Sequence, residues 1–254
     1  MTKAMFPSPH IDWNERCVYL ITSSDGGVLF DLDHDEFLKL DPIATEMWTL
    51  LSAGKREAEV VEHIAGRYSA DQNRVALDLK NFVQSAAARG ITPGCVHLKN
   101  ETRSAISSSK YPTYPWYGQD ANARRPVPTR LTVLRALFGL ALFDLTLSAR
   151  SLKSLCRLVS EWPLKTSSKT GDSDLIGRIC TAVERACVWY PKKAVCLQRS
   201  AVTACLLKSI GIRAELIVGA RVMPMVSHAW VEVDGSVIND HPKVKNVFRP
   251  MASF

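Results

Sequence analysis

The chain of 254 residues predicts an α+β fold in two domains. In the first hundred residues short strand-like runs precede amphipathic helices, and in the second half several helices precede strands. The charge also changes sign: residues 1–100 hold 10 Lys and Arg against 14 Asp and Glu, and residues 101–254 hold 22 against 11. Two domains of ordinary size fit this length. We expect them at residues 1–97 and 130–254.

Three strands and then three helices are expected in the first domain. The residues Ser23-Ser24-Asp25-Gly26-Gly27 are those that a hairpin turn requires. Asp41 and Pro42 fit the N-cap and the first position of a helix. Turn residues and apolar periodicity together place the strands at residues 17–22, 28–32 and 36–40, and the helices at residues 41–54, 56–66 and 71–89.

Residues 98–129 have a different character and are expected to form a linker. They are rich in Ser, Pro, Tyr and Arg and show no helical or strand period, which is typical of an extended connection. The second domain then begins with helices. Helical spacing and turn signals place helices at residues 131–147, 151–161, 174–190 and 196–210, and strands at residues 213–218, 228–233 and 236–239.

Composition excludes several classes of protein. The N-terminus has no apolar segment of a secretory signal, and the seven cysteines form no CxxC pair. Both features favour free thiols in a reducing cytoplasm. No Cys/His cluster has the spacing of zinc ligands, so neither a metal nor a cofactor is expected. The apolar window 131–147 contains Arg135 and Asp144 and is shorter than the roughly 20 residues of a spanning helix. We expect it to be a buried amphipathic helix, with peripheral membrane contact as the lesser alternative and no stable membrane insertion.

The order of Cys196, His228 and Asp240 predicts a cysteine acyl-transfer site. Cys196 lies at a helix start, where partial positive charge favours the thiolate. His228 begins a strand and would accept and return the thiol proton. Asp240 ends the strand paired with it across the Asp234-Gly235 hairpin, where it could fix the imidazole tautomer.

A cysteine on an apolar helix is more often part of the core than a nucleophile. We expect that ordinary role for Cys156, Cys180, Cys187 and Cys205. Cys196 differs because a helix start, a strand, a hairpin and a strand end follow one another within a compact stretch.

The stretch from Cys196 to Asp240 resembles the transglutaminase-like cysteine peptidases that mature lasso peptides. The shared features are Cys196-Leu197 at the helix start, Gly211-Ile212, the run His228-Ala229-Trp230-Val231-Glu232, and Asp240. This resemblance covers roughly residues 130–250. It implies a papain-like second domain, catalytic roles for Cys196, His228 and Asp240, and an ATP-dependent, asparagine-synthetase-like macrolactam synthetase as a partner.

The first domain resembles the PqqD-like leader-recognition element, a small winged helix-turn-helix. The resemblance rests on residues 27–32, 38–41, 44–48 and 88–91. It implies that a leader peptide adds as a strand along the third strand, beside the third helix. Carried over to this sequence, the peptide-binding residues are Glu36, Phe37, Leu38, Lys39, Leu40, Arg74, Val75 and Asp78.

Together the two resemblances imply a fused leader peptidase that binds the leader of a lasso precursor and hydrolyses the leader–core bond. Two alternatives are transglutaminase-type transfer to an amine, which uses the same residues, and a non-catalytic peptide-binding scaffold, against which the intact Cys, His and Asp count. A winged helix could also bind DNA. The net acidic first domain argues against that, because DNA binding requires a cationic face.

Overall fold

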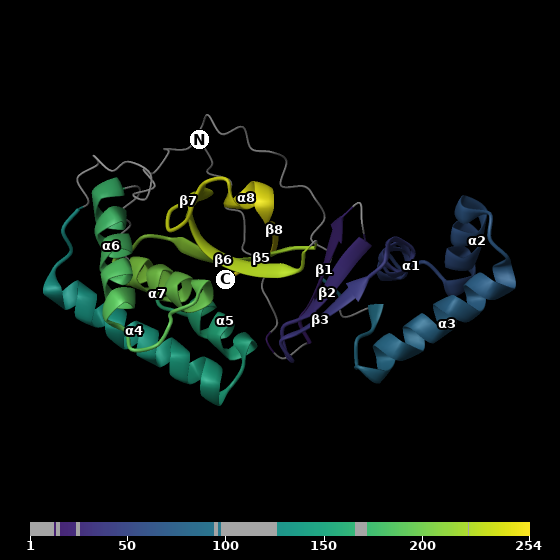
Figure 1. Cartoon of the computed structure of the whole chain (residues 1–254), viewed down its shortest axis with the longest axis horizontal. Helices are drawn as coiled ribbons and strands as arrows, with labels where there is room; N and C mark the ends of the chain where they lie inside the picture. The colour runs from purple at the N-terminus through teal and green to yellow at the C-terminus, as the bar shows by residue number, and fades with distance from the viewer. Residues whose placement is uncertain are drawn as a thin grey trace.

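The structure is a computed structural model that describes residues 13, 16–23, 26–93, 96–97, 126–165, 172–222 and 224–254. It contains two four-stranded sheets, each covered by helices (Figure 1). The α+β class that the sequence predicts is confirmed. Most of the expected linker, residues 98–125, lies outside the described residues, and the domain boundaries therefore stay predictions.

The first sheet is a meander with one free edge. Strands β1 (Val18–Ser23), β2 (Gly26–Asp31) and β3 (Glu36–Leu40) pair antiparallel in order, and β4 (Val96–His97) lies parallel to β1. The three expected strands are confirmed to within two residues. The order β3-β2-β1-β4 leaves β3 at the edge of the sheet, where its outer backbone groups have no strand partner among the described residues.

Three helices follow, as the sequence predicts. Helix α1 (Pro42–Ser52) is capped by the Asp41 carboxylate, which accepts from the Ala44 N–H at 2.7 Å. Helices α2 (Glu57–Tyr68) and α3 (Gln72–Ala88) then form a pair at the far end of the domain (Figure 1).

Both faces of the first sheet are buried. One packs on helices of its own domain, and the other packs on the second domain. Val18, Leu20 and Leu29 pack with Trp48 of α1 and Ala86 of α3. The opposite face belongs to the large core that also holds the second domain, and its members from the first sheet are Tyr19, Ile21, Val28 and Phe30. The sheet is therefore a shared wall between the two domains, since alternate residues of a strand point to opposite faces.

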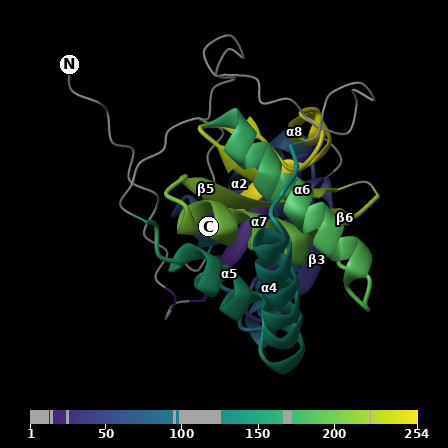
Figure 2. The same ribbon diagram turned by 90° about the vertical axis from the view of Figure 1, so that its left-hand side faces the viewer.

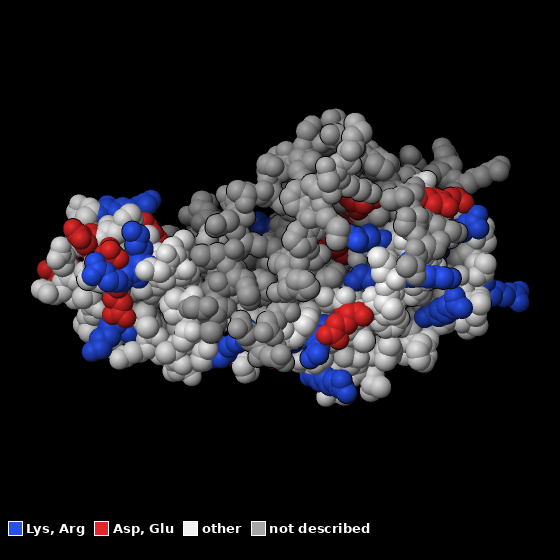
Figure 3. Space-filling view, turned by 180° about the vertical axis from the view of Figure 1, so that it is seen from behind, with Lys and Arg blue, Asp and Glu red and all other residues white. Residues whose placement is uncertain are grey.

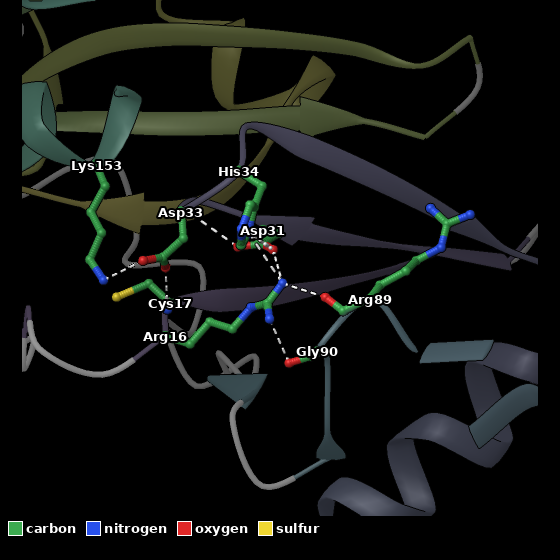
Figure 4. A network of polar contacts seen from close by, with 8 residues as sticks. All are labelled: Arg16, Cys17, Asp31, Asp33, His34, Arg89, Gly90 and Lys153. Carbon is green, nitrogen blue, oxygen red and sulfur yellow. Dashed lines mark hydrogen bonds and ion pairs between the residues drawn. The ribbon is translucent and has the colours of Figure 1, made fainter. Parts of the chain in front are cut away.

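Polar contacts fix the β2–β3 turn at this boundary (Figure 4). The Asp31 carboxylate, which is 2% exposed, accepts from the Arg16 guanidinium, and Arg16 also donates to the carbonyls of Arg89 and Gly90 after α3. The Asp33 carboxylate pairs with Lys153 of the second domain at 2.6 Å. These contacts therefore bind the turn to both the first and the second domain.

In the second domain one helix, α7 (Cys196–Ser209), packs on the second sheet, and three further helices pack around α7. These three are α4 (Arg130–Ala149), α5 (Leu152–Ser160) and α6 (Ser173–Trp189), and Figure 2 shows all four from the helical side. The sheet has the order β7-β6-β5-β8 and is antiparallel throughout. Its strands are β5 (Ala214–Arg221), β6 (Val226–Val233), β7 (Ser236–Val237) and β8 (Arg249–Ser253).

The expected helices are confirmed, and so is the hairpin between β6 and β7. Asp234 and Gly235 both have positive φ, of 49° and 79°, as the tightest hairpin turn requires. Three elements were not expected from the sequence: β4, the short helix α8 (Val244–Val247) and β8. All three segments are short and show no periodic pattern. Strand β8, which begins Arg-Pro, is a strand because it pairs with β5.

The expectation that residues 131–147 form a buried helix is wrong for the outer face of α4. Ala136, Leu140 and Phe143 are buried, but the apolar residues continue around the helix, and Leu131, Leu134, Phe138 and Leu145 are exposed. By length and composition α4 could span a membrane: its mean hydropathy is 1.6, and only 17% of that window is buried inside the protein. Among the described residues it is the one helix that meets these criteria.

The charge difference between the two halves is visible on the surface. Seen from behind, acidic and basic side chains are mixed over the α2–α3 end, whereas Lys and Arg predominate over the opposite end (Figure 3).

Gly219 of β5 lies directly opposite His228 of β6, where a side chain has no room. A Cβ added there would lie 2.7 Å from both the Arg249 carbonyl oxygen and the Trp230 ring. We expect Gly219→Ala to lower the free energy of unfolding by about 2 kcal/mol, because the buried backbone must shift. Urea unfolding measures this.

Gly66 in α2 is the matched control, since nothing lies within 4 Å of a Cβ added at that position. Gly66→Ala should raise the free energy of unfolding by about 0.5–1 kcal/mol through helix propensity. Equal effects of the two substitutions would contradict the packing described at Gly219.

Candidate active site

Cys196 is the first residue of α7, as the sequence predicts. Val195 precedes it in an extended conformation, and the Gln198 side chain accepts from the Val195 N–H at 3.1 Å, which closes the helix start. The thiol therefore lies where the free N–H groups of the helix produce partial positive charge.

His228 and Asp240 lie together beside this helix start. The Nε2 atom of His228 is 2.6 Å from Oδ2 of Asp240, and both side chains are about one-fifth exposed. The second carboxylate oxygen of Asp240 accepts from the His241 N–H at 2.6 Å. Because Nε2 is taken by Asp240, Nδ1 is the ring nitrogen available to the Cys196 thiol.

The structure also brings Cys196 and His228 together through a hydrogen bond between their side chains. Burial acts to raise the pKa of the Cys196 thiol, but hydrogen bonds from His228 and from the Ala229 and Leu197 N–H groups outweigh it and lower the pKa. Hydrogen bonds to Asp240 first and to Cys196 second raise the pKa of His228 to about 9. Both shifts favour the thiolate–imidazolium form of the pair over the neutral thiol and imidazole.

The remaining cysteines have the opposite character. Burial raises the pKa of the Cys180 and Cys205 thiols to about 12, and it also raises the pKa of Cys156 and Cys187. Cys156, Cys180 and Cys205 are buried in the large core, and Cys187 is half-buried against it. Among the cysteines for which a shift is resolved, Cys196 is thus the one poised as a thiolate.

A buried hydrogen-bond network holds the three elements of the site in place. Ser200, one turn after Cys196 and fully buried, donates to the Ala229 carbonyl at 2.9 Å. The Asn239 amide donates to the Ser200 hydroxyl at 2.9 Å, and the Asn239 carbonyl oxygen accepts from the Val231 N–H at 2.7 Å. Ala229 follows His228 and Asn239 precedes Asp240, so Ser200 positions the neighbours of both. Sequence reasoning missed this pair, although Ser200 stands four residues after Cys196.

Aromatic rings complete the surroundings of His228. Its ring lies 4.9 Å from Phe248 and 6.3 Å from Trp230, measured between centroids. The Trp230 N–H donates to the Glu232 carboxylate at 2.8 Å, as residues two apart on one face of a strand can do. Phe248, which follows α8, was not expected near the site because nothing in its local sequence marks it.

One cation, Arg199, lies beside the acidic member of the site. It is 3.9 Å from Asp240 and helps to lower the pKa of that carboxyl against the effect of burial. Lys192, in the loop before α7, pairs instead with Asp144 of α4 at 2.6 Å. No group of acidic, His and Cys residues among the described part of the chain could hold a metal ion.

The residues expected to bind a leader peptide do not form one surface. Leu40 is 3% exposed, and its side chain packs in the first domain's core together with Leu38. Val75 is 5% exposed and packs between α1, α2 and α3, with Arg74 and Asp78 exposed on either side of it. Phe82 and Ala86, further along α3, are the helix residues that share a core with Leu38. The segment of α3 that lies beside β3 is therefore about two helical turns further along the chain than the expected residues 74–78.

Strand β3 also borders the cleft that contains Cys196. A cleft of about 640 Å³ lies between the domains. Its lining residues come from β2, β3 and the turn between them, from the α4–α5 junction, from the start of α7, and from β5 and β6: Phe30, Asp33, His34, Asp35, Phe37, Leu147, Arg150, Ser151, Leu152, Val195, Cys196, Leu197, Val218, Ser227, His228 and Ala229.

Known proteins match both parts of the chain. Residues 139–253 match the family model of the transglutaminase-like superfamily, and residues 26–91 match that of coenzyme PQQ synthesis protein D (PqqD). The microcin J25-processing protein McjB of Escherichia coli is 44% identical over 54 residues, which are 21% of this chain and 26% of McjB. These matches confirm the expected transglutaminase-like and PqqD-like domains, and they support the expected family, that of the lasso peptide maturation B proteins.

A solved structure is also similar: TbiB1 in complex with the TbiA(beta) leader peptide. It is 32% identical, covers 30% of this chain and 90% of its own, and has a TM-score of 0.29. The matched segment of McjB is about a quarter of that protein's length. This chain therefore joins a PqqD-like domain to a transglutaminase-like domain, and the second domain contains Cys196, His228 and Asp240.

The charge state of the site predicts how Cys196 reacts with pH. In Asp240→Asn the largest cause of the raised pKa of His228 is lost, so that pKa should fall from about 9 toward 6.5. The imidazolium then disappears near neutral pH and the pKa of Cys196 rises. We expect alkylation of Cys196 by iodoacetamide to slow about tenfold at pH 7 and to be unchanged at pH 10, where the thiol ionises without help.

Peptide mapping after timed alkylation measures the rate at Cys196. The matched control is Asp174→Asn on α6, whose carboxylate pairs with Arg178 away from the site. If Asp240→Asn leaves the rate at pH 7 unchanged, Asp240 does not sustain the thiolate.

Proposed function

We propose that this chain is a cysteine leader peptidase of lasso peptide biosynthesis. It would bind the leader of a ribosomally made precursor and hydrolyse the leader–core peptide bond. One observation carries the proposal: Cys196, at the start of α7, shares a cleft with His228, whose Nε2 atom is held by Asp240 at 2.6 Å.

The reaction follows from the charge state of the pair. The Cys196 thiolate attacks the scissile carbonyl, and protonated His228 donates its Nδ1 proton to the leaving amine of the core. The leader then remains on Cys196 as a thioester. Water attacks this thioester and gives a proton to His228, which releases the leader acid and restores the thiolate. Asp240 keeps the ring oriented and stabilises its charge throughout.

The PqqD-like domain would hold the leader at the free edge of β3. An extended peptide can add to such an edge by main-chain hydrogen bonds. The matches to the processing protein McjB and to TbiB1 with its leader peptide support this role. A leader bound on the same chain raises the effective concentration of the scissile bond at Cys196.

Transfer to an amine is the second candidate, because the matched superfamily is transglutaminase-like. It differs only in the acceptor of the acyl group. We further propose a cytoplasmic location and an ATP-dependent macrolactam synthetase that takes up the released core, both of which follow from the family resemblance.

Replacing the nucleophile tests the proposal. Cys196→Ala should lower kcat for cleavage of a candidate lasso precursor by more than about 10³-fold, because the sulfur that forms the thioester is removed. Mass spectrometry of the products gives the rate, and it also shows whether the leader ends as an acid or as an amide.

Cys187→Ala is the matched control, since Cys187 is half-buried and its thiol has a raised pKa. It should cleave at the rate of the natural chain. Cleavage that persists in Cys196→Ala would refute the assignment, and a leader amide formed with an added amine would favour transfer over hydrolysis.

A further inference from the structure

The cleft at Cys196 is built by both domains. Cys196, Leu197 and His228 line it from the transglutaminase-like domain, while Phe30 and Phe37 line it from the PqqD-like domain. The recognition domain therefore reaches the site of reaction itself.

The two faces of β3 are directed to different surroundings. Phe37 pairs with Phe30 across the sheet and stacks on it with a centroid distance of 4.4 Å, on the face turned toward the transglutaminase-like domain. Leu38, the next residue, packs on the opposite face with α1 and α3. Alternation along the strand thus separates Phe37 from the face beside α3.

The lining has an apolar floor and a polar rim. Phe30, Leu152 and Val218 are buried in the floor, and Phe37 is 37% exposed above it. The charged residues are at the rim: His34, Asp35 and Arg150 are exposed, and Asp33 is neutralised by Lys153. An apolar side chain placed against this floor would be removed from water, whereas a charged one would meet no buried ionic partner among the lining residues.

The β2–β3 turn, which immediately precedes the strand of Phe37, is held in place by ion pairs. The turn before β3 is held through Asp33 to Lys153 of α5 and through Asp31 to Arg16 (Figure 4). Contacts of this kind from both domains keep Phe37 at a set position relative to Cys196, which a subsite for one side chain requires.

We propose that Phe37 is a specificity-determining residue and forms, with Phe30 and Leu147, a subsite for an apolar side chain of the substrate. That side chain belongs to one of the two residues before the carbonyl that Cys196 attacks. The inference rests on the proposed function. It assigns Phe37 to selection at the scissile bond rather than to leader affinity.

Three chloromethyl ketones test the subsite without a known precursor: acetyl-Gly-Phe, acetyl-Phe-Gly and acetyl-Gly-Gly. In each, the Cys196 thiolate displaces chloride and forms a thioether that peptide mapping detects. In the natural chain, at least one of the Phe-containing compounds should alkylate Cys196 about tenfold faster than acetyl-Gly-Gly, the gain expected for burying a phenyl ring in part. Phe37→Ala should reduce this ratio below about threefold.

Two further variants control for folding and for general loss of an aromatic ring. Phe37→Trp should fill the subsite and also reduce the ratio. Phe138→Ala removes an exposed ring on α4, outside the cleft, and should leave the ratio unchanged. The rate with iodoacetamide, which has no side chain to place, should be the same in all of them.

The outcomes separate this inference from the proposed function. If iodoacetamide does not alkylate Cys196 faster than the other cysteines, the nucleophile itself is wrong. If Cys196 reacts with iodoacetamide but the three ketones react equally, or if Phe37→Ala keeps the tenfold ratio, the nucleophile stands and the subsite is wrong.

Discussion

The burial of both faces of the first sheet is the constraint on which the arrangement of this protein depends. Its strands pack against α1 and α3 on one side and join the core of the transglutaminase-like domain on the other. A sheet with two apolar faces cannot expose either one without a large loss of buried area. The two domains are therefore held together by the sheet itself, and the β2–β3 turn is placed beside Cys196 as a consequence.

Within the second domain, one buried hydroxyl connects the parts of the site. Ser200 links α7, which begins at Cys196, to the backbone of β6 beside His228 and to Asn239 beside Asp240. These bonds lie one residue from His228 and from Asp240, and one helical turn from Cys196. The ionised Cys196–His228 pair then needs no metal or cofactor in our proposed mechanism; its charge is sustained by Asp240 and by N–H groups at the helix start.

Local patterns were sufficient to predict most of the elements and the meeting of Cys196, His228 and Asp240, because caps, hairpin turns and helical spacing act over a few residues. They were not sufficient where strand pairing or tertiary packing determines the structure. Strand β8 exists through its pairing with β5, and Val75 is inside a core that periodicity alone could not distinguish from a groove. Phe37 was expected at the leader edge, but which domain its face of β3 would meet depended on tertiary structure.

The mass of Cys196 during turnover tests the central claim most directly. The chain is mixed with a candidate lasso precursor, quenched in acid within its first turnover, and mapped by mass spectrometry. Our account predicts a transient thioester between the leader and Cys196, which disappears as the free leader acid accumulates. Release of the leader while Cys196 remains unmodified at every time point, and also after iodoacetamide has blocked it, would contradict the account.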